Sequence, residues 1–274
     1  MHRVLDIRRH PLKSAAAEHL DEVVVTADGL DGDRIWTCLG ADDTVGSAKQ
    51  PRLWGGLLAV TASLSAQGDA AADMLVTVPG GKALEAGGPE ADAALSDWLG
   101  HPVRLTRHPP KQLKRHHWWP DEPGMIPDWA AGVEPGGDDL VAVRAGADGR
   151  FFDFGPLHLV TTGALARLGA EHGEAVDPAR FRPNLILDLP ADPEPGQRIA
   201  IGADLLVKTV VPTPRCVIPS LAHGAAPADP ALLKTLASHH RVDVPEYGRA
   251  TCFGFYAEIL AAGTARTGDE VRVL

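Results

Sequence analysis

Val211-Pro212-Thr213-Pro214-Arg215-Cys216-Val217-Ile218-Pro219 is the segment around which the second half of the chain is arranged. It follows a β-like run at 204–210, and its prolines fix the backbone and remove amide donors. The thiol of Cys216 is therefore presented on a stiff turn, beside the cation of Arg215. That cation stabilises a thiolate, the form that attacks electrophiles and binds soft metals. The alternative is that Cys216 is a small buried hydrophobe, as most free cysteines are.

Composition restricts the classes of protein to consider. The 274 residues are enough for about two domains. With 26 basic and 36 acidic residues, the net charge of −10 argues against non-specific binding to nucleic acid or to an anionic membrane. The three cysteines form no CxxC pair, so we expect neither a zinc site nor a redox dithiol, and a reducing cytoplasm is the simplest setting. Asp6 comes too early for a signal peptide, and no apolar run approaches the roughly 18 residues of a membrane span.

Short strand-like runs separated by Gly, Pro and Asp predict a mainly β fold with a few helices (α+β), most simply a barrel or two fused half-barrels. Three of the expected strands are 33–39, 57–64 and 151–154. Helices are expected over 90–99, 164–169 and 230–238, because proline, threonine or glycine punctuates their ends.

Residues 109–137 have no periodicity and are rich in Pro, Gly, Trp and His, so we interpret them as a crossing between two domains, 1–108 and 138–274. Within this crossing, His116-His117-Trp118-Trp119 suggests a metal or stacking site. A packed linker is the favoured interpretation, because adjacent residues do not face one another in regular structure.

The first half contains a candidate anion site. Lys13, Ser14 and Arg34 are expected at turns or strand edges, where side chains and free backbone amides can meet an anion. The alternative is a pair of solvated surface cations.

The second half offers further candidates. Thr161 and Thr162 precede a helix whose N-terminus attracts anions, although helix capping alone would explain them. Pro183 should hold Arg182 extended, and Asn184 supplies a donor and an acceptor where an apolar strand begins. A surface salt bridge is the alternative role for Arg182.

Taken together, several short fragments resemble the MOSC family, named for the C-terminal domain of molybdenum-cofactor sulfurases, preceded by the family's N-terminal β-barrel domain. The fragments are His10-Pro11-Leu12-Lys13-Ser14, Gly32-Asp33-Arg34, Ser47-Ala48-Lys49-Gln50-Pro51-Arg52-Leu53, Phe181-Arg182-Pro183-Asn184, Pro214-Arg215-Cys216 and Gly268-Asp269-Glu270-Val271. Each is weak alone, but their order and spacing over nearly the whole chain make the resemblance specific. It implies a MOSC β-barrel domain over 138–274 fused to a smaller N-terminal β-barrel-like domain over 1–108.

The resemblance also implies a molybdenum cofactor (molybdopterin) between the two domains, with the Cys216 thiolate as a ligand of molybdenum, and no requirement for pyridoxal phosphate. The residues expected by resemblance to hold the pterin and its phosphate are Lys13, Ser14, Arg34, Thr161, Thr162, Arg182, Asn184 and Arg215. Cations at turns of an acidic chain suit a buried phosphate, and the arginine fork matches phosphate oxygens.

Characterised members of the family reduce N-hydroxylated compounds such as amidoximes and hydroxylamines, by removing the hydroxyl oxygen at molybdenum. By resemblance, we expect a molybdenum-dependent oxidoreductase acting on a small N-oxygenated substrate. The sequence contains no cysteine set for an iron–sulfur cluster, so we expect electrons from a separate protein of the reductase, ferredoxin or cytochrome type. Leu221-Ala222-His223-Gly224 stands where many relatives carry Asp-x-x-x-Gly, which leaves the substrate pocket open.

Two other functions compete with the reductase. One is a non-catalytic carrier that holds a persulfide or the molybdenum cofactor at Cys216. The other is a cysteine hydrolase with His223 as its base, which is disfavoured because no oxyanion-hole signature is present. Metal and pterin analysis separates the carrier of sulfur from the reductase.

Overall fold

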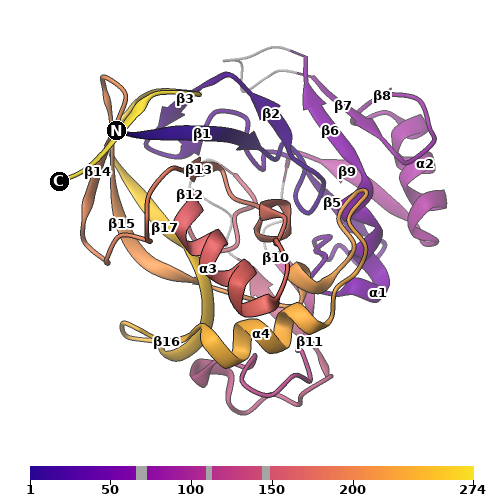
Figure 1. The fold of residues 1–274 in the computed structure, drawn as a ribbon. Helices are drawn as coiled ribbons and strands as arrows, with labels where there is room; N and C mark the ends of the chain where they lie inside the picture. Colours follow the sequence, from indigo (N-terminus) through magenta and orange to yellow (C-terminus); the bar gives the residue numbers. More distant parts are fainter. Residues whose placement is uncertain (66–72, 109–112, 144–148) are drawn as a thin grey trace.

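Seven strands close into a barrel in the computed structural model, which describes residues 1–65, 73–108, 113–143 and 149–274 (Figure 1). Around the barrel the order is β12 (Leu157–Thr161), β13 (Leu185–Leu187), β1 (His2–Arg9), β19 (Glu270–Val273), β14 (Arg198–Ile201), β15 (Leu205–Pro214) and β17 (Gly248–Ala261). β17 pairs with β12 to close the ring. The expected mainly β fold is confirmed, because the chain is 39% strand and 19% helix.

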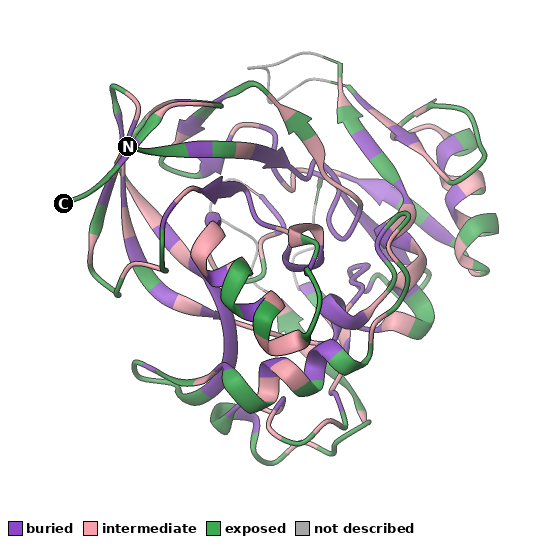
Figure 2. Cartoon of the chain, in the orientation of Figure 1, coloured by how far each residue is buried: buried purple, intermediate pink, exposed green. Residues whose placement is uncertain are grey.

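Alternating burial explains why these runs form barrel strands. In β15 every second residue from Leu205 to Thr213 is buried, which is the period of a strand with one face on the core. The inward aliphatic side chains of the barrel strands form one core, to which Val4, Leu159, Ile199 and Val207 belong. Figure 2 shows this burial along the barrel strands, with exposed residues on the outer faces of the helices.

β1 belongs to the N-terminal part of the chain, yet it lies in the barrel between β13 and β19. β2 (Glu18–Leu20) pairs with β1, and β3 (Glu22–Thr26) pairs with both β4 (Gly29–Leu30) and β18 (Gly263–Arg266). The two chain ends accordingly lie close together in Figure 1. The division into 1–108 and 138–274 stays a prediction, but the first strands pair with those of the second half.

A second core lies beside the barrel and is built from residues of the first half. It joins β5 (Thr37–Gly40) and β9 (Val103–Thr106) to a small sheet of β6 (Thr61–Leu64), β7 (Met74–Thr77) and β8 (Leu84–Glu85). The helices α1 (Pro51–Trp54), η1 (Gly55–Ala59) and α2 (Pro89–Leu99) contribute buried side chains to it. Figure 1 shows α2 beside β7 and β8. Trp54 and Leu95 are almost completely buried in this core.

All three expected helices form. They are α2, α3 (Thr162–His172) and α4 (Ala231–His239), and short 3₁₀ turns occur at η3 (Pro178–Phe181) and η4 (Ile218–Ser220). α3 and α4 pack on each other through Leu168, Leu232 and Leu236. In the described part of the chain, no helix combines the length and the apolar composition that a membrane crossing requires.

Three strand predictions are wrong in part. The strand expected over 33–39 begins only at Thr37, and the one expected over 57–64 begins at Thr61, after η1. Residues 151–154 form no strand, because the backbone of Phe151 bonds to the turns of the first half instead. Its N–H donates to Arg34 O at 2.9 Å, and its carbonyl accepts from Lys13 Nζ at 2.9 Å.

The expected patternless crossing over 109–137 is also corrected. β10 (Leu113–Trp118) pairs along its whole length with β11 (Asp138–Val143), and η2 (Asp128–Ala130) lies between them. Polar side chains on both faces of β10 hide its strand period, which is why the sequence pattern missed it. Residues 109–112 of the crossing lie outside the described residues. A further unpredicted strand, β16 (Arg241–Val244), pairs with β17.

Gly254→Ala is expected to lower the free energy of unfolding by about 2–4 kcal/mol, measured by urea denaturation. Gly254 has φ +68°, and an added Cβ would lie 2.6 Å from Leu159 O in the neighbouring barrel strand. Gly100→Ala is the matched control, since its φ of +76° is similar but no atom lies within 4 Å of the added Cβ. We expect this control to lose only about 1 kcal/mol, from backbone strain alone. Equal losses in the two variants would refute the steric explanation.

Candidate functional site

Six of the residues singled out from the sequence line one small cavity of about 70 Å³. They are Lys13, Ser14, Arg34, Arg182, Arg215 and Cys216. They come from four separate turns: after β1, after β4, after η3 and after β15. The alternative of solvated surface cations is therefore wrong for Lys13, whose side chain is buried.

A larger cavity of about 620 Å³ adjoins the first. The residues that line both are Lys49, Asp153, Pro214, Arg215, Cys216 and Tyr256. Cys216 therefore lies at the junction of a small cationic cavity and a larger one.

The backbone at the small cavity is held in an uncommon conformation. Ser14, Arg34 and Arg182 have φ of 67°, 54° and 55°, in the left-handed region that non-glycine residues seldom adopt. The expectation that Pro183 keeps Arg182 extended is thus wrong. Each such residue costs on the order of 1–2 kcal/mol. Surrounding hydrogen bonds, such as the one from Arg34 N to His10 O at 2.7 Å, hold this conformation. The cations are therefore in place before an anion binds.

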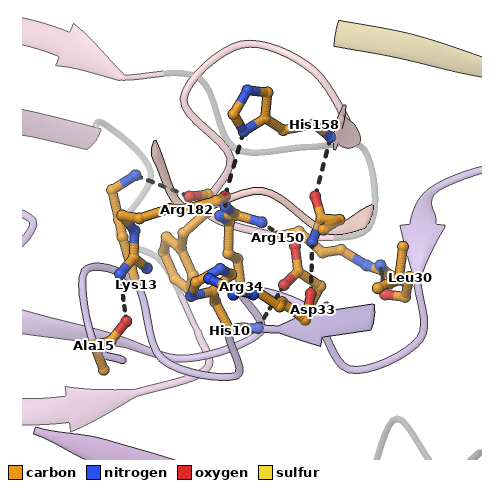
Figure 3. Close-up of polar contacts among 12 residues, drawn as sticks. His10, Lys13, Ala15, Leu30, Asp33, Arg34, Arg150, His158 and Arg182 are labelled. Carbon is orange, nitrogen blue, oxygen red and sulfur yellow. Dashed lines mark hydrogen bonds and ion pairs between the residues drawn. The ribbon is translucent and has the colours of Figure 1, made fainter. Parts of the chain in front are cut away.

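Two of these arginines lie against each other (Figure 3). Arg34 Nη2 donates to Arg182 O at 3.4 Å, while Arg34 Nη1 pairs with the buried carboxylate of Asp33. Arg182 Nη1 donates to Ala15 O, but Arg182 Nη2 is buried without a hydrogen-bond partner among the residues that the structure describes. Burial, together with the nearby charge of Arg34, lowers the pKa of Arg182 to about 9. A buried donor without a partner is costly, and an anionic oxygen would satisfy it.

Lys13, Lys49 and Asp153 form a charged group at the boundary of the two cavities. Lys13 Nζ donates to Asp153 Oδ1 at 2.8 Å, and Lys49 Nζ lies 3.3 Å from Asp153 Oδ2. Burial lowers the pKa of Lys13 to about 8, against the attraction of Asp153. Burial by itself would raise the pKa of Asp153, but Lys13, Lys49 and Arg115 hold it well below its usual range. The group of two lysines and one carboxylate therefore has a net positive charge when both lysines are protonated.

All three side-chain nitrogens of Arg215 bond to other groups of the protein. Its Nε and Nη2 donate to Phe253 O at 3.0 and 2.6 Å, and its Nη1 donates to Phe181 O at 3.1 Å. Its Nη2 also bonds to His158 Nε2 at 2.6 Å. Burial and the charge of Arg215 lower the pKa of His158 well below its usual value, so the neutral ring accepts this bond. Arg215 therefore orients the turn before Cys216.

The three cysteines have different environments. Cys38 and Cys252 are buried in separate core clusters, and burial raises the pKa of each thiol to about 12. Cys216 is half-buried and borders both cavities. Cys216 is thus not fully buried as the alternative interpretation expected: it packs partly against an apolar cluster that includes Leu58 and Ile218, and it also lines both cavities.

The structure does not bring Thr161, Thr162 and Asn184 to either cavity. Thr161 Oγ1 caps α3 by accepting from Ala164 N at 3.2 Å, as the capping alternative proposed. Thr162 Oγ1 donates to Leu189 O at 3.2 Å. Asn184 joins two strands, since its Oδ1 accepts from His158 N at 3.0 Å and its Nδ2 donates to Arg8 O. These three side chains are satisfied by the protein itself.

His223 also lies away from the cavities. Its Nε2 donates to Ile218 O at 2.9 Å, and burial lowers the pKa of its ring to about 4. It lines neither cavity, so the arrangement gives no support to a cysteine–histidine hydrolase.

Sequence reasoning missed several residues of the cavity walls: Lys49, Arg115, His117, Trp119, Asp153 and Tyr256. Lys49 stood inside one of the quoted fragments, which was a usable signal. His117 and Trp119 were assigned to a packed linker, but their rings stack at 4.1 Å on the wall of the larger cavity. Asp153 was missed because it falls within the strand expected over 151–154.

Comparisons with known proteins show the family to which the chain belongs. Residues 147–272 match the MOSC domain, and residues 1–104 match the MOSC N-terminal beta barrel domain. The chain is 26% identical, over 299 residues, to mitochondrial amidoxime-reducing component 1 of Homo sapiens, covering 97% of this chain and 81% of that protein. The resemblance inferred from the short fragments is thereby confirmed.

Solved structures give more distant similarities. The YUAD protein from Bacillus subtilis aligns with a TM-score of 0.47 and 12% identity, over 100% of this chain and 96% of that one. YiiM from Geobacillus stearothermophilus aligns with a TM-score of 0.33 and 18% identity, over 44% of this chain and 54% of that one.

Asp153→Asn is expected to lower the pKa of Lys13 further below about 8 in the full chain prepared without cofactor, because burial remains while the attraction of the carboxylate is lost. The measurement is an NMR pH titration of ¹³C-methylated lysines. Asp139→Asn serves as the control, since Asp139 lies on the wall of the larger cavity but bonds to Trp119 Nε1 at 2.7 Å. A Lys13 signal that titrates near 10.5, or that does not respond to Asp153→Asn, would contradict this account.

Proposed function

Because the chain belongs to the MOSC family, carrying both its MOSC domain and its N-terminal β-barrel domain, we propose that it binds a molybdenum cofactor and reduces N-hydroxylated compounds. A separate protein supplies the electrons. The observation that carries the proposal is the position of Cys216, whose thiol borders a cationic cavity on one side and a larger cavity on the other. The similarity to an amidoxime-reducing component supports the choice of substrate class.

The residues of the small cavity fit an anionic cofactor. Arg182 Nη2 is a buried donor that lacks a partner, and Lys13, Arg34 and Lys49 add positive charge around the same space. A buried charge without a counter-charge costs several kcal/mol, which a phosphate group would offset. In this proposal Arg182, Arg34, Lys13 and Ser14 hold the phosphate and the polar edge of the pterin.

Cys216 fits the role of the metal ligand, because thiolates suit soft metals that change oxidation state. When bound, the cofactor supplies the two-electron redox chemistry of the reaction. Arg215 does not hold phosphate in this scheme. Its hydrogen bonds to Phe253 O and Phe181 O instead fix the turn that presents the thiol. This revises the role expected for Arg215 and keeps the role expected for Cys216.

The chain itself supplies groups that can move protons. Conversion of an N–OH group to N–H and water consumes two electrons and two protons. Lys49 lines both cavities, as Cys216 does, so its Nζ is placed to donate a proton on the substrate side. Asp153, which lies 3.3 Å from this ammonium, orients it.

The test is elemental and pterin analysis of the protein expressed in a host that makes the cofactor, followed by an assay of hydroxylamine reduction with an artificial electron donor. Near-stoichiometric molybdenum and pterin with reduction of the substrate are expected. A carrier of sulfur would instead purify with a persulfide on Cys216 and without stoichiometric molybdenum. Loaded protein that reduces no N-hydroxylated compound would overturn the proposed reaction.

Cys216→Ala is expected to abolish reduction of N-hydroxylated substrates while the fold persists, because Cys216 is only half-buried. Partial retention of the pterin with altered molybdenum spectra should accompany the loss, since the phosphate contacts lie on other residues. Activity per loaded molecule and the molybdenum spectrum are the measurements. Cys38→Ala and Cys252→Ala are controls that should keep the wild-type spectrum. Wild-type turnover by Cys216→Ala would remove this residue from the mechanism.

Arg182→Ala is expected to weaken cofactor binding on the order of 10- to 100-fold, which corresponds to one charge-assisted hydrogen bond. Cofactor content after dialysis is the measurement. Arg266→Ala removes an exposed cation that pairs with Glu22 at 2.8 Å and lines neither of these two cavities, so it should leave cofactor content unchanged. Equal occupancy in the two variants would argue against a phosphate contact at Arg182.

A further inference from the structure

The larger cavity is built largely by the segment 113–143, which overlaps the region 109–137 that showed no periodic pattern in the sequence. This segment supplies Trp119 and Trp129, and other parts of the chain supply Phe154 and Tyr256. We call these four residues the aromatic wall. Met125, Val133 and Leu140 also line this cavity.

The rings of the aromatic wall are arranged as flat, supported surfaces. Trp119 stacks on His117 at 4.1 Å with an interplanar angle of 22°, and Phe154 stacks on Tyr256 at 5.4 Å with an angle of 30°. Trp129 meets Tyr247 edge to face at 5.8 Å. Burial, followed by the charges of Lys49 and Arg115, lowers the pKa of His117 to about 2, so this ring stays neutral behind Trp119. Supported ring faces of this kind favour stacking with another aromatic ring.

The two ends of the larger cavity differ in chemistry. The end shared with the small cavity carries Cys216, Lys49 and Asp153, which are polar or ionisable, together with Tyr256 of the aromatic wall. The part that belongs to the larger cavity alone carries Trp119, Trp129 and Phe154. Its charged residues, Arg115 and Asp139, bond to His117 and to Trp119 Nε1. A ligand that extends from the thiol into this space therefore has a polar head and an apolar body.

The exposure of the wall agrees with a binding role. Trp129 is 47% exposed and Phe154 is 52% exposed, although both are large apolar side chains. Clustered exposed aromatics that line a hollow mark a binding site, whereas scattered ones need no explanation. A volume of about 620 Å³ lies within the range of about 300–1,000 Å³ for small-molecule sites, and it far exceeds what hydroxylamine itself needs.

We propose that the larger cavity selects substrates with a planar aromatic body, which packs against the aromatic wall while the N–O group points toward Cys216. This inference rests on the proposed function for the identity of the reacting group. Trp129 and Phe154 are specificity-determining residues in it. A protein partner covering the exposed rings is the competing occupant, but the rings line a concave space next to the thiol, which favours a small molecule.

Binding tests the inference independently of turnover. Benzamide and acetamide carry the same polar head and cannot be reduced at an N–O bond, so calorimetric titration of the loaded full chain with each isolates the contribution of the ring. We expect benzamide to bind more tightly than acetamide. Trp129→Ala and Phe154→Ala should each weaken benzamide binding roughly 3- to 10-fold, the effect of losing one aromatic contact.

Trp98→Ala is the matched control. Trp98 is exposed to a similar extent, 41%, but it lies on α2, where its Nε1 donates to Gly56 O at 2.9 Å, and it lines neither cavity. Benzamide affinity should not change in this variant. Circular dichroism of all three variants identifies any that has failed to fold. If one of the two wall variants, Trp129→Ala or Phe154→Ala, does not fold, the benzamide affinity of the other still tests the inference.

Turnover provides the second readout. For the aromatic substrate benzamidoxime and the aliphatic acetamidoxime, the ratio of kcat/KM should favour the aromatic compound in the native chain. This ratio should fall in Trp129→Ala, mainly through the KM of benzamidoxime, and should persist in Trp98→Ala.

The outcomes separate the two proposals. If benzamide binds selectively and loses affinity in the wall variants while no N-hydroxylated compound is reduced, the proposed reaction fails and the aromatic site stands. If benzamide and acetamide bind equally, or the wall variants leave benzamide affinity unchanged, the inference is overturned and the exposed rings are left for a protein partner.

Discussion

The burial of several positive charges around one small space is the constraint on which the rest of the site depends. Arg34 donates to the backbone carbonyl of Arg182, and its positive charge helps to lower the pKa of Arg182, so the two cations repel each other. In the described part of the chain, Arg182 Nη2 has no partner. Like charges repel strongly where water is excluded, and the carboxylates of Asp33 and Asp153 offset part of this repulsion. The left-handed backbone at Ser14, Arg34 and Arg182 holds the cations in this unfavourable arrangement. Such stored strain is typical of a preorganised anion site.

The position of β1 explains how these charges meet. β1 lies inside the barrel between strands of the second half, so the turn that follows it, with Lys13 and Ser14, is delivered to the end of the barrel. β15 ends at the same region and presents Arg215 and Cys216. Four turns that are distant in sequence are thereby fixed relative to one another by strand pairing.

Arginine serves two different purposes at this site. Among the described residues, Nη2 of Arg182 is a buried donor without a partner, which makes Arg182 suited to bind an anion. The side-chain nitrogens of Arg215 instead bond to Phe253 O, Phe181 O and His158. Residue type and proximity to the cysteine would have ranked Arg215 first. Only the count of satisfied hydrogen bonds separates a group that binds from a group that positions.

The sequence by itself determined the fold class, the three longer helices and the family, because periodicity, end signals and ordered short fragments are local properties of the chain. It also picked out Lys13, Ser14, Arg34, Arg182, Arg215 and Cys216, which the structure brings to one cavity. Only the tertiary structure decided that Thr161, Thr162 and Asn184 are satisfied by the protein, and that His117 and Trp119 form a cavity wall. The physical reason is that satisfaction of a polar group and the shape of a cavity depend on partners that are distant in sequence, and local patterns carry no information about them.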